Sequence, residues 1–479
     1  MSTLTDIFEA QGRKRWAIAR TTASERIAKL QRLRKAIVAR QQEFYDAVWT
    51  DFHKPKTEAW LSEIFPAIEE IDYTINHLPD WVEDQPGKWS WLFPTNSSVS
   101  HFEPKGRVLI MAPWNYPFLL FITPVVAAIA AGNLVIAKPS HKTPRVEAFL
   151  ESLIAEVFEK DEVAVVSGAG AEMGDQLLAL PFDHIFFTGS PKVGAHIAEC
   201  AAKTHASITL ELGGKSPVIV LDKVNIKDAA PKIAWGKCLN AGQTCIAPDY
   251  ILCPKDLVQE LAAAIAESIK AMYGSTEEER RNSESFVHIV ESRAVDRHRA
   301  LIEDATAKGA TAIIGGEFSA SDIENRYTPA TVLTNVTADM LVMQSEIFGP
   351  ILPIIAYETL DEAIQFVQQR PKPLALYIFG KSQPQIDAII AQTTSGSTCV
   401  NNCILQISNP SVPFGGVGMS GTGNYHGIYS FKTFSHERNI MTQGVVNGVS
   451  FLYPPYHKQE DKGLRAKIQR FAAKIMGLA

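Results

Sequence analysis

The sequence predicts an α/β protein with two open parallel sheets, each covered by helices. Short apolar runs alternate with helical stretches along most of the chain, and this alternation is typical of parallel strands joined by helical crossovers. The chain has 479 residues, which is too many for one simple core, so about three structural units are expected. The first series of expected strands covers residues 108–111, 134–137, 164–166, 185–187 and 208–210, and the second covers 217–221, 313–314, 351–355 and 375–379.

The first expected element is a helix over residues 23–51, which are rich in Arg, Lys, Gln and Glu and contain no proline. After it, residues 108–137 carry no charge and are long enough to span a membrane. Three prolines and a turn at Gly132-Asn133 divide this stretch. We therefore expect a strand, a loop, a core helix and a second strand in a soluble interior.

Two further segments do not follow the alternation. Residues 89–101 are rich in Ser, Thr, Asn and aromatic residues without a helical period, and we expect them to pair with the strand-like stretch 440–446. Near the C-terminus, apolar residues recur at spacings of four and three among basic residues, which predicts an amphipathic basic helix. These residues are Leu464, Ile468, Phe471, Ile475 and Leu478. Two interpretations of this helix stay open: packing on its own subunit, or an exposed role at a membrane surface or a substrate entrance.

The composition limits the partners and the compartment. The net charge is −6 with both signs mixed, which argues against nucleic-acid binding and leaves small molecules or proteins as partners. The six cysteines form no CxxC pair, so neither a disulfide framework nor a zinc site is expected. With no secretory signal at the N-terminus, a cytoplasmic location is predicted.

Cys245 and Glu211 are the residues most suggestive of chemistry. Cys245 follows small and polar residues in 240–244, a setting in which a thiol is accessible and shifts towards thiolate. Glu211 lies just before Gly213-Gly214, where a strand ends and a ligand can come close. Taken singly, a cysteine is more often part of a core and such a glutamate is usually a solvated turn residue. As a pair, they suggest a nucleophile and a base.

Further motifs make this pairing specific. In order, they cover residues 102–106, 112–117, 138–140, 187–190, 211–215, 242–245, 346–350 and 413–416. Their order resembles the aldehyde dehydrogenase superfamily over nearly the whole chain. Finer motifs at 235–237, 246–250, 425–427 and 431–436 resemble its class 3 branch, which includes fatty and aromatic aldehyde dehydrogenases.

The resemblance implies an aldehyde dehydrogenase-like fold with a division of the chain. A variant Rossmann dinucleotide-binding domain would comprise residues 1–85 and 104–210 with about 404–428. A catalytic thiol domain would comprise residues 211–403. A small β oligomerisation arm would comprise 86–103 and 429–450, followed by a tail, 451–479, that contains the amphipathic helix. A homodimer is implied.

The resemblance also implies roles for three residues. Cys245 would attack the aldehyde as thiolate, giving a thiohemiacetal and then a thioester. The side-chain amide of Asn115 and the Cys245 N–H would hold the oxyanion, and Glu211 would be the general base for hydrolysis. By composition alone, Asn115 is a turn residue before Tyr116-Pro117. For Glu211, the alternative is a carboxylate that only orders its loop.

The cofactor site lacks the GxGxxG fingerprint of a conventional Rossmann fold. A strand instead runs into a helix whose N-terminus could receive a pyrophosphate. The resemblance assigns cofactor contacts to Trp114, Lys138, Gly189, Ser190, Gly194, Glu346 and Phe348. Within this set, Lys138 would contact the adenosine ribose, Glu346 would hold the nicotinamide ribose and Phe348 would pack near the ring.

His141 departs from the family pattern. Three positions after the Lys138 equivalent, many NAD-preferring relatives have a glutamate that accepts the 2′-hydroxyl and repels a 2′-phosphate. His141 removes that charge, so NADP alone or beside NAD is expected, although a lone histidine is more often merely exposed and neutral.

The predicted function is therefore NAD(P)-dependent oxidation of medium- or long-chain aliphatic, or aromatic, aldehydes to acids. Two alternatives stay open: an acylating enzyme in which coenzyme A takes the acyl group from Cys245, and a non-catalytic dinucleotide-binding scaffold. Peripheral contact with a membrane through the C-terminal helix is a further expectation.

Overall fold

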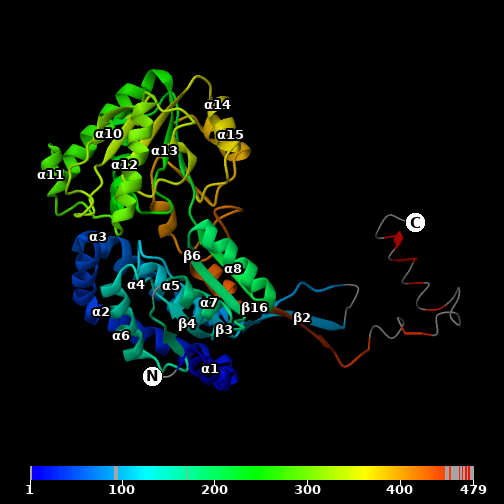
Figure 1. The fold of residues 1–479 in the computed structure, drawn as a ribbon. Coiled ribbons are helices and arrows are strands. Elements are labelled where there is room, and N and C mark those ends of the chain that lie inside the picture. The colour runs from blue at the N-terminus through cyan, green and yellow to red at the C-terminus, as the bar shows by residue number, and fades with distance from the viewer. Residues whose placement is uncertain are drawn as a thin grey trace. The chain divides into compact units, whose positions relative to one another are not determined.

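The computed structural model describes residues 3–90, 95–168 and 170–447, and residues 453–454, 463, 467, 470–471 and 473–474 beyond them. Its contacts divide the chain into two compact units. The larger unit, residues 1–81 and 104–435, contains two parallel sheets, and the smaller unit is formed by residues 82–103 and 436–479 (Figure 1).

The first sheet of the larger unit has six strands in the order β15-β7-β6-β3-β4-β5. Its strands are β3 (Arg107–Met111), β4 (Leu134–Lys138), β5 (Val163–Val165), β6 (His184–Gly189), β7 (Ser207–Leu212) and β15 (Gly421–Thr422). All pairs are parallel except that between β15 and β7, and the first series of expected strands is confirmed. The chain moves outward from β3 to β5 and then returns to β6 on the other side of β3, so the topological switch point lies between β3 and β6.

Helices precede, separate and follow the strands of this sheet along the chain. They are α1 (Leu4–Ala19), α2 (Ala23–Phe52), α3 (Lys56–Ala59), the π-helical turn η1 (Trp60–Ile64), α4 (Phe65–Trp81), α5 (Leu119–Ala130), α6 (Pro144–Val157), α7 (Gly170–Leu178), α8 (Pro191–Thr204) and α16 (Gly427–Thr433). The expected helix 23–51 is confirmed as α2, which packs against α4, α5 and α6. Capping boxes at Thr3 and Thr22 begin α1 and α2, because each threonine satisfies a free backbone N–H at the helix start.

The uncharged stretch 108–137 folds as expected. It forms most of β3, the loop 112–118, the helix α5 and most of β4, and every residue of α5 after Leu119 is buried. Apolar side chains of neighbouring strands, among them Leu109, Ile136, Ile185 and Leu210, form the core on one face of the sheet. No helix in the described part of the chain has the length and apolar character needed to cross a membrane.

The second sheet has seven strands in the order β10-β11-β12-β9-β8-β13-β14. They are β8 (Pro217–Val220), β9 (Tyr250–Pro254), β10 (Thr311–Ile314), β11 (Thr331–Thr334), β12 (Ile351–Tyr357), β13 (Ala375–Phe379) and β14 (Ser397–Val400). Only the edge strand β10 is antiparallel to its neighbour. The expected strands of the second series are present, and β9, β11 and β14 are additional.

The helices of the second sheet follow the same alternation. They are α9 (Ile226–Cys238), η2 (Leu239–Gly242), η3 (Lys255–Leu257), α10 (Val258–Tyr273), α11 (Glu277–Arg281), α12 (Ser292–Ala307), α13 (Leu341–Gln344), α14 (Leu360–Gln368), α15 (Gln383–Gln392) and η4 (Leu405–Ser408). A core that includes Ile219, Leu252, Leu333 and Ile378 lies between strands and helices.

The third sheet has the order β1-β2-β16, with β1 at Gln85–Pro86, β2 at Asn96–Pro104 and β16 at Ser435–Gln443. The expected pairing of residues 89–101 with the stretch 440–446 is confirmed for the parts that lie in β2 and β16, namely 96–101 and 440–443. The predicted C-terminal helix rests on Leu464, Ile468, Ile475 and Leu478, which lie outside the described residues.

Candidate active site

The predicted site residues lie where strands of the six-stranded sheet end. β3 leads into Trp114 and Asn115, β4 ends at Lys138, β6 runs into Ser190, and Glu211 is the last residue but one of β7. Open α/β sheets bind ligands outside the carboxyl ends of their strands, next to the switch point. The order of the strands thus brings these sequence-distant residues to one edge.

The loop of Cys245 begins with an unusual turn. Asn240 and Ala241 have φ angles of 53° and 50°, a left-handed conformation that non-glycine residues adopt only when other contacts stabilise it. The Gln243 side chain supplies three such contacts: it donates to the carbonyl oxygens of Asn240 and His288 at 3.1 Å each and accepts from Val290 N at 3.0 Å. Cys245 follows as a free cysteine, and the residue as a whole is of intermediate exposure.

Asn115 is joined directly to this turn. Its Nδ2 donates to Gln243 O at 3.0 Å, and Asn240 Nδ2 donates to Asn115 O at 2.8 Å. The next residues are joined as well, because the hydroxyls of Tyr116 and Thr244 lie 2.7 Å apart. Loops that follow β3 and α9 therefore place Asn115 beside the segment that carries Cys245.

Glu211 is buried beside the same segment. Its side chain is 3% exposed, and neither carboxylate oxygen has a hydrogen-bond partner among the described residues. Burial raises the pKa of Glu211 well above its usual value. Its charge also acts on the Cys245 thiol, so the two residues that the sequence pairs are close enough to interact.

The Cys245 thiol does not have the predicted thiolate character. Burial raises its pKa to about 12, and Glu346 and Glu211 act in the same direction, whereas the N–H groups of Cys245 and Ile246 lower it. The predicted shift towards thiolate is wrong for this structure, first because the thiol is buried and then because two carboxyl groups from distant parts of the chain lie near the sulfur. A positive charge or a base must act before this thiol becomes a nucleophile at neutral pH.

Glu346 packs against the glycine pair after β7. A Cβ atom on Gly213 would come within 2.2 Å of Glu346 Oε2, so only glycine leaves room for this carboxyl group. Burial and the neighbouring Asp249 raise the pKa of Glu346 to about 8, while the Gly214 N–H lowers it. Arg297 Nη1 donates to Glu346 O at 3.1 Å and fixes the backbone here.

Two aromatic rings predicted for the cofactor site meet. The Trp114 and Phe348 rings lie edge to face, with centroids 5.4 Å apart and planes at 79°. Lys142 Nζ lies 5.6 Å from the Trp114 ring centroid. Phe348 has a φ of 50°, so its backbone is held in a conformation that places the ring beside Trp114.

Four more residues predicted for the cofactor site lie at the start of α8 or at and just after the end of β4. Ser190 is the exposed N-cap residue of α8, and its hydroxyl caps no N–H in the described structure, so hydroxyl and helix N-terminus are both available to a phosphate. A Cβ on Gly194 would come within 2.8 Å of Leu212, so this glycine lets α8 pack closely on β7. Lys138 is buried, and His141 is exposed beside it. Burial, then Lys138 and Lys142, lower the pKa of His141.

Sequence reasoning missed three charged residues under this site. Lys54 and Glu63 form an ion pair at 2.7 Å with both side chains 0% exposed, and Glu58 accepts a hydrogen bond from Asn240 N at 2.8 Å. No local pattern marks them, since charged residues at helix positions are ordinarily solvated. Within the described residues, His, Cys, Asp and Glu form no group that could hold a metal ion.

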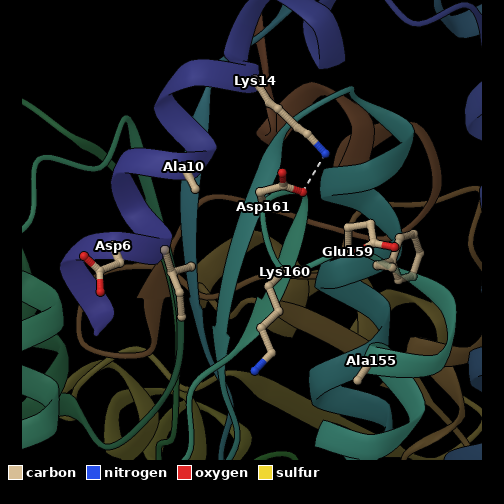
Figure 2. A pocket seen from close by; sticks show the side chains of 9 residues that line it. Asp6, Ala10, Lys14, Ala155, Glu159, Lys160 and Asp161 are labelled. Atoms are coloured by element: carbon tan, nitrogen blue, oxygen red, sulfur yellow. Dashed lines mark hydrogen bonds and ion pairs between the residues drawn. The ribbon is translucent and has the colours of Figure 1, made fainter. Parts of the chain in front are cut away.

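A surface pocket lies elsewhere, between α1 and the residues around the end of α6. Figure 2 shows Lys14 of α1 directed towards Asp161, and the two form an ion pair at 2.6 Å. Ile7, Ala10, Ala155 and Phe158 provide its apolar lining. None of its lining residues belongs to the predicted site.

Comparisons with known proteins identify the family to which this chain is similar. The sequence model of the aldehyde dehydrogenase family matches residues 5–440. The dimeric NADP-preferring aldehyde dehydrogenase of Canis lupus familiaris is 40% identical over 90% of this chain and 93% of its own. Aldehyde dehydrogenase family 3 member A2 of Mus musculus is 40% identical over 90% of this chain and 87% of its own.

Two proteins of Staphylococcus aureus are also similar. Its 4,4′-diaponeurosporen-aldehyde dehydrogenase is 41% identical over 90% of this chain and 92% of its own. The substrate-bound state of S. aureus AldH superposes with a TM-score of 0.92 at 37% identity, over 98% of this chain and 100% of that chain. Both the predicted fold and the predicted likeness to class 3 are confirmed. The chain therefore belongs to the aldehyde dehydrogenase family and is an aldehyde dehydrogenase that uses NAD or NADP.

Proposed function

We propose that this enzyme oxidises extended apolar aldehydes, either medium- or long-chain aliphatic or aromatic, to carboxylic acids through a covalent bond to Cys245. The observation that carries the proposal is the grouping of a thiol, a side-chain amide and a buried carboxyl group, where the loop of Cys245 meets the strand ends of the six-stranded sheet. Cys245, Asn115 and Glu211 supply a nucleophile, an oxyanion donor and a base, which aldehyde oxidation followed by hydrolysis requires.

In the first step, the sulfur of Cys245 bonds to the aldehyde carbon, its proton leaves to solvent, and the carbonyl oxygen becomes negative. Asn115 Nδ2 uses one hydrogen for Gln243 O, so its second hydrogen can donate to that oxygen together with the Cys245 N–H. NAD or NADP, when bound, would supply the oxidant: the former aldehyde carbon would lose its hydride to the nicotinamide as the oxyanion collapses to a carbonyl, which leaves a thioester on Cys245. The six-stranded sheet would form the dinucleotide-binding domain and the seven-stranded sheet the catalytic domain, within the residue ranges predicted from the sequence.

Residues at the strand ends would hold the cofactor. The α8 N-terminus and Ser190 would bind its pyrophosphate, and Lys138 would bind the adenosine ribose. Glu346 would accept hydrogen bonds from the nicotinamide ribose hydroxyls, beside the rings of Phe348 and Trp114. Gly189 and Gly194 would let the backbone approach the cofactor closely. Position 141 itself carries no carboxylate to repel a 2′-phosphate, the nearby Glu291 carboxylate is paired with Lys142 at 2.6 Å, and the canine relative is named as NADP-preferring.

In the last step, Glu211 takes a proton from water while the water oxygen attacks the thioester carbon. The carbon–sulfur bond breaks, the acid is released and the Cys245 thiolate is regenerated. A carboxyl group whose pKa is raised by burial is suited to this task near neutral pH. Hydrolysis is favoured over transfer to coenzyme A because this base lies beside the sulfur.

Two observations support extended apolar substrates. Trp60, Leu61 and Phe65 are 42%, 56% and 44% exposed, although they belong to the helical segment whose inner face binds the turn before Cys245. Exposed apolar side chains gathered on one segment typically mark a binding surface. A relative 41% identical to this chain is named for 4,4′-diaponeurosporen-aldehyde.

A homodimer joined through the third sheet is proposed as well. The strands β2 and β16 come from distant parts of the chain and leave β1 and β16 as edges, which can pair with another chain. A relative is named as dimeric. Residues 464–478 stay the candidate for contact with a membrane surface.

The test compares wild type with Cys245→Ala on aldehydes of graded chain length, following the absorbance of reduced nicotinamide with and without coenzyme A. We expect activity that rises with apolar length and does not need coenzyme A. The variant should lose oxidation and keep dinucleotide binding. Turnover near wild type in the variant would refute the role of Cys245, and dependence on coenzyme A would assign the acylating reaction instead.

A further inference from the structure

The proposed reaction requires the loop of Asn115 and the loop of Cys245 to keep a fixed position relative to each other. The Asn115 amide follows β3 and the Cys245 thiol follows α9, so they belong to different sheets of the larger unit. Misplacing a catalytic group by about 1 Å can cost about 100-fold in rate. The segment 54–65, which comprises the two residues before α3, α3 itself, η1 and the first residue of α4, contacts both loops through three charged side chains.

Lys54 and Glu63 contact the Asn115 loop. Glu63 Oε2 accepts from Phe118 N at 2.8 Å and from Leu119 N at 3.4 Å, so its carboxylate caps the start of α5. Lys54 Nζ pairs with the other oxygen of Glu63 and lies 4.1 Å from the centroid of the Tyr116 ring. Both members of this ion pair belong to segment 54–65 and are 0% exposed. The segment therefore presents a buried, paired charge to the residues that follow Asn115.

Glu58 contacts the Cys245 loop. Its Oε1 accepts from Asn240 N at 2.8 Å, the first residue of the left-handed pair that precedes Cys245. Such a strained turn persists only where its surroundings fix it. Burial raises the pKa of Glu58 to about 7, while Lys54 and the Asn240 N–H lower it and Glu63 raises it.

A π-helical turn, Trp60–Ile64, follows Glu58 and contains Glu63. A π turn inserts one residue into a helix and is found mostly at functional sites. On the two sides of the start of this turn, the Glu58 carboxylate accepts from the Cys245 loop and the Glu63 carboxylate accepts from the Asn115 loop.

We propose that Glu58, together with the Lys54–Glu63 pair, is a positioning residue that sets the Asn115 amide relative to the Cys245 thiol. The inference rests on the proposed roles of Asn115 and Cys245. None of the three side chains touches the reacting atoms. Their effect is to fix two loops to one rigid segment, so that the oxyanion donor and the nucleophile are already in place when the aldehyde arrives.

The experiment replaces Glu58 by Ala, Gln and Asp in the full chain. Steady-state kinetics are measured per thiol, after counting reactive Cys245 by iodoacetamide labelling and mass spectrometry. We expect Glu58→Ala to lower kcat about 10- to 100-fold with the cofactor KM unchanged. Glu58→Gln keeps an acceptor for Asn240 N and should remain within about threefold of wild type, whereas Glu58→Asp is too short and should lose kcat.

A matched control is Glu279→Ala, because Glu279 also accepts from backbone N–H groups, Ser275 N at 2.7 Å and Thr276 N at 3.1 Å, but on α11. It should leave kcat per thiol unchanged. Wild-type kcat in both the Ala and the Asp variants would overturn the proposal, as would equal losses in the Gln variant. If Glu58→Ala does not fold, the Asp and Gln variants decide the outcome. Cys245→Ala is measured in parallel, and activity in that variant would refute the proposed function independently of Glu58.

Discussion

Replacing Glu211 by Gln should make the enzyme slower and more stable at the same time. The carboxylate is 3% exposed, with both oxygens unpartnered in the described structure. A buried polar group left without a hydrogen bond costs about 1–3 kcal/mol, and more when it is charged. Glutamine keeps the shape and removes the charge. We therefore expect the free energy of unfolding at pH 8 to rise by about 1–2 kcal/mol.

The pH dependence of this gain has a definite sign. Because the pKa of Glu211 is raised in the folded state from 4.5, the folded protein binds more protons than the unfolded chain above that pH. The stability that the Glu211 carboxyl group contributes is fully present below its pKa in the unfolded chain. This stability is lost as the pH rises towards its pKa in the folded protein, by up to about 1.4 kcal/mol per pH unit. The difference between variant and wild type should therefore be small at pH 5 and grow towards pH 8.

The same variant tests catalysis. Losing a general base typically costs about 10²- to 10⁴-fold, and here the loss should fall on hydrolysis of the thioester. A stoichiometric burst of reduced nicotinamide followed by a slow steady state is expected in stopped-flow absorbance. Equal free energies of unfolding for the variant and the wild type at pH 8 would refute the inference that the buried Glu211 carboxylate destabilises the fold. A missing burst with normal cofactor binding would place Glu211 at an earlier step.

Three further predictions concern other parts of the chain. His141→Glu should shift the ratio of kcat/KM for NADP and NAD towards NAD, because a carboxylate would repel the 2′-phosphate; an unchanged ratio would mean that position 141 does not face that ribose. Lys54→Met should lower the free energy of unfolding by about 3–5 kcal/mol by leaving Glu63 buried and unpaired, and adding Glu63→Leu should recover part of it in urea denaturation. A cost below about 1 kcal/mol, as for a surface pair, would contradict their burial. Truncation after Gly463 should change relative activity on long and short aldehydes or binding to anionic vesicles, and no change in either would leave the C-terminal helix as ordinary packing.

Periodicity and composition predicted most of the larger unit. The strands with continuous apolar runs, such as 134–137, were predictable because both faces of a parallel strand are buried. The strands Thr331–Thr334 and Ser397–Val400 were not, since four residues with polar members carry too little pattern. The helix α1 was also unpredicted, although Thr3 and Asp6 form a capping box that marks its start.

The family and the candidate nucleophile, base and amide could be identified from the order of residue types along the chain. How those groups are held and charged depends on contacts that form only when the chain folds. The pKa of Cys245 is raised rather than lowered because the thiol is buried in the fold and because Glu346 and Glu211, far away along the chain, lie near its sulfur. In the same way, Lys54, Glu58 and Glu63 carry no distinguishing pattern in the sequence, and the fold turns them into a buried ion pair and a partly buried hydrogen-bond acceptor. Electrostatic energies depend on distance and on exclusion of water, and neither quantity is defined until the chain has folded.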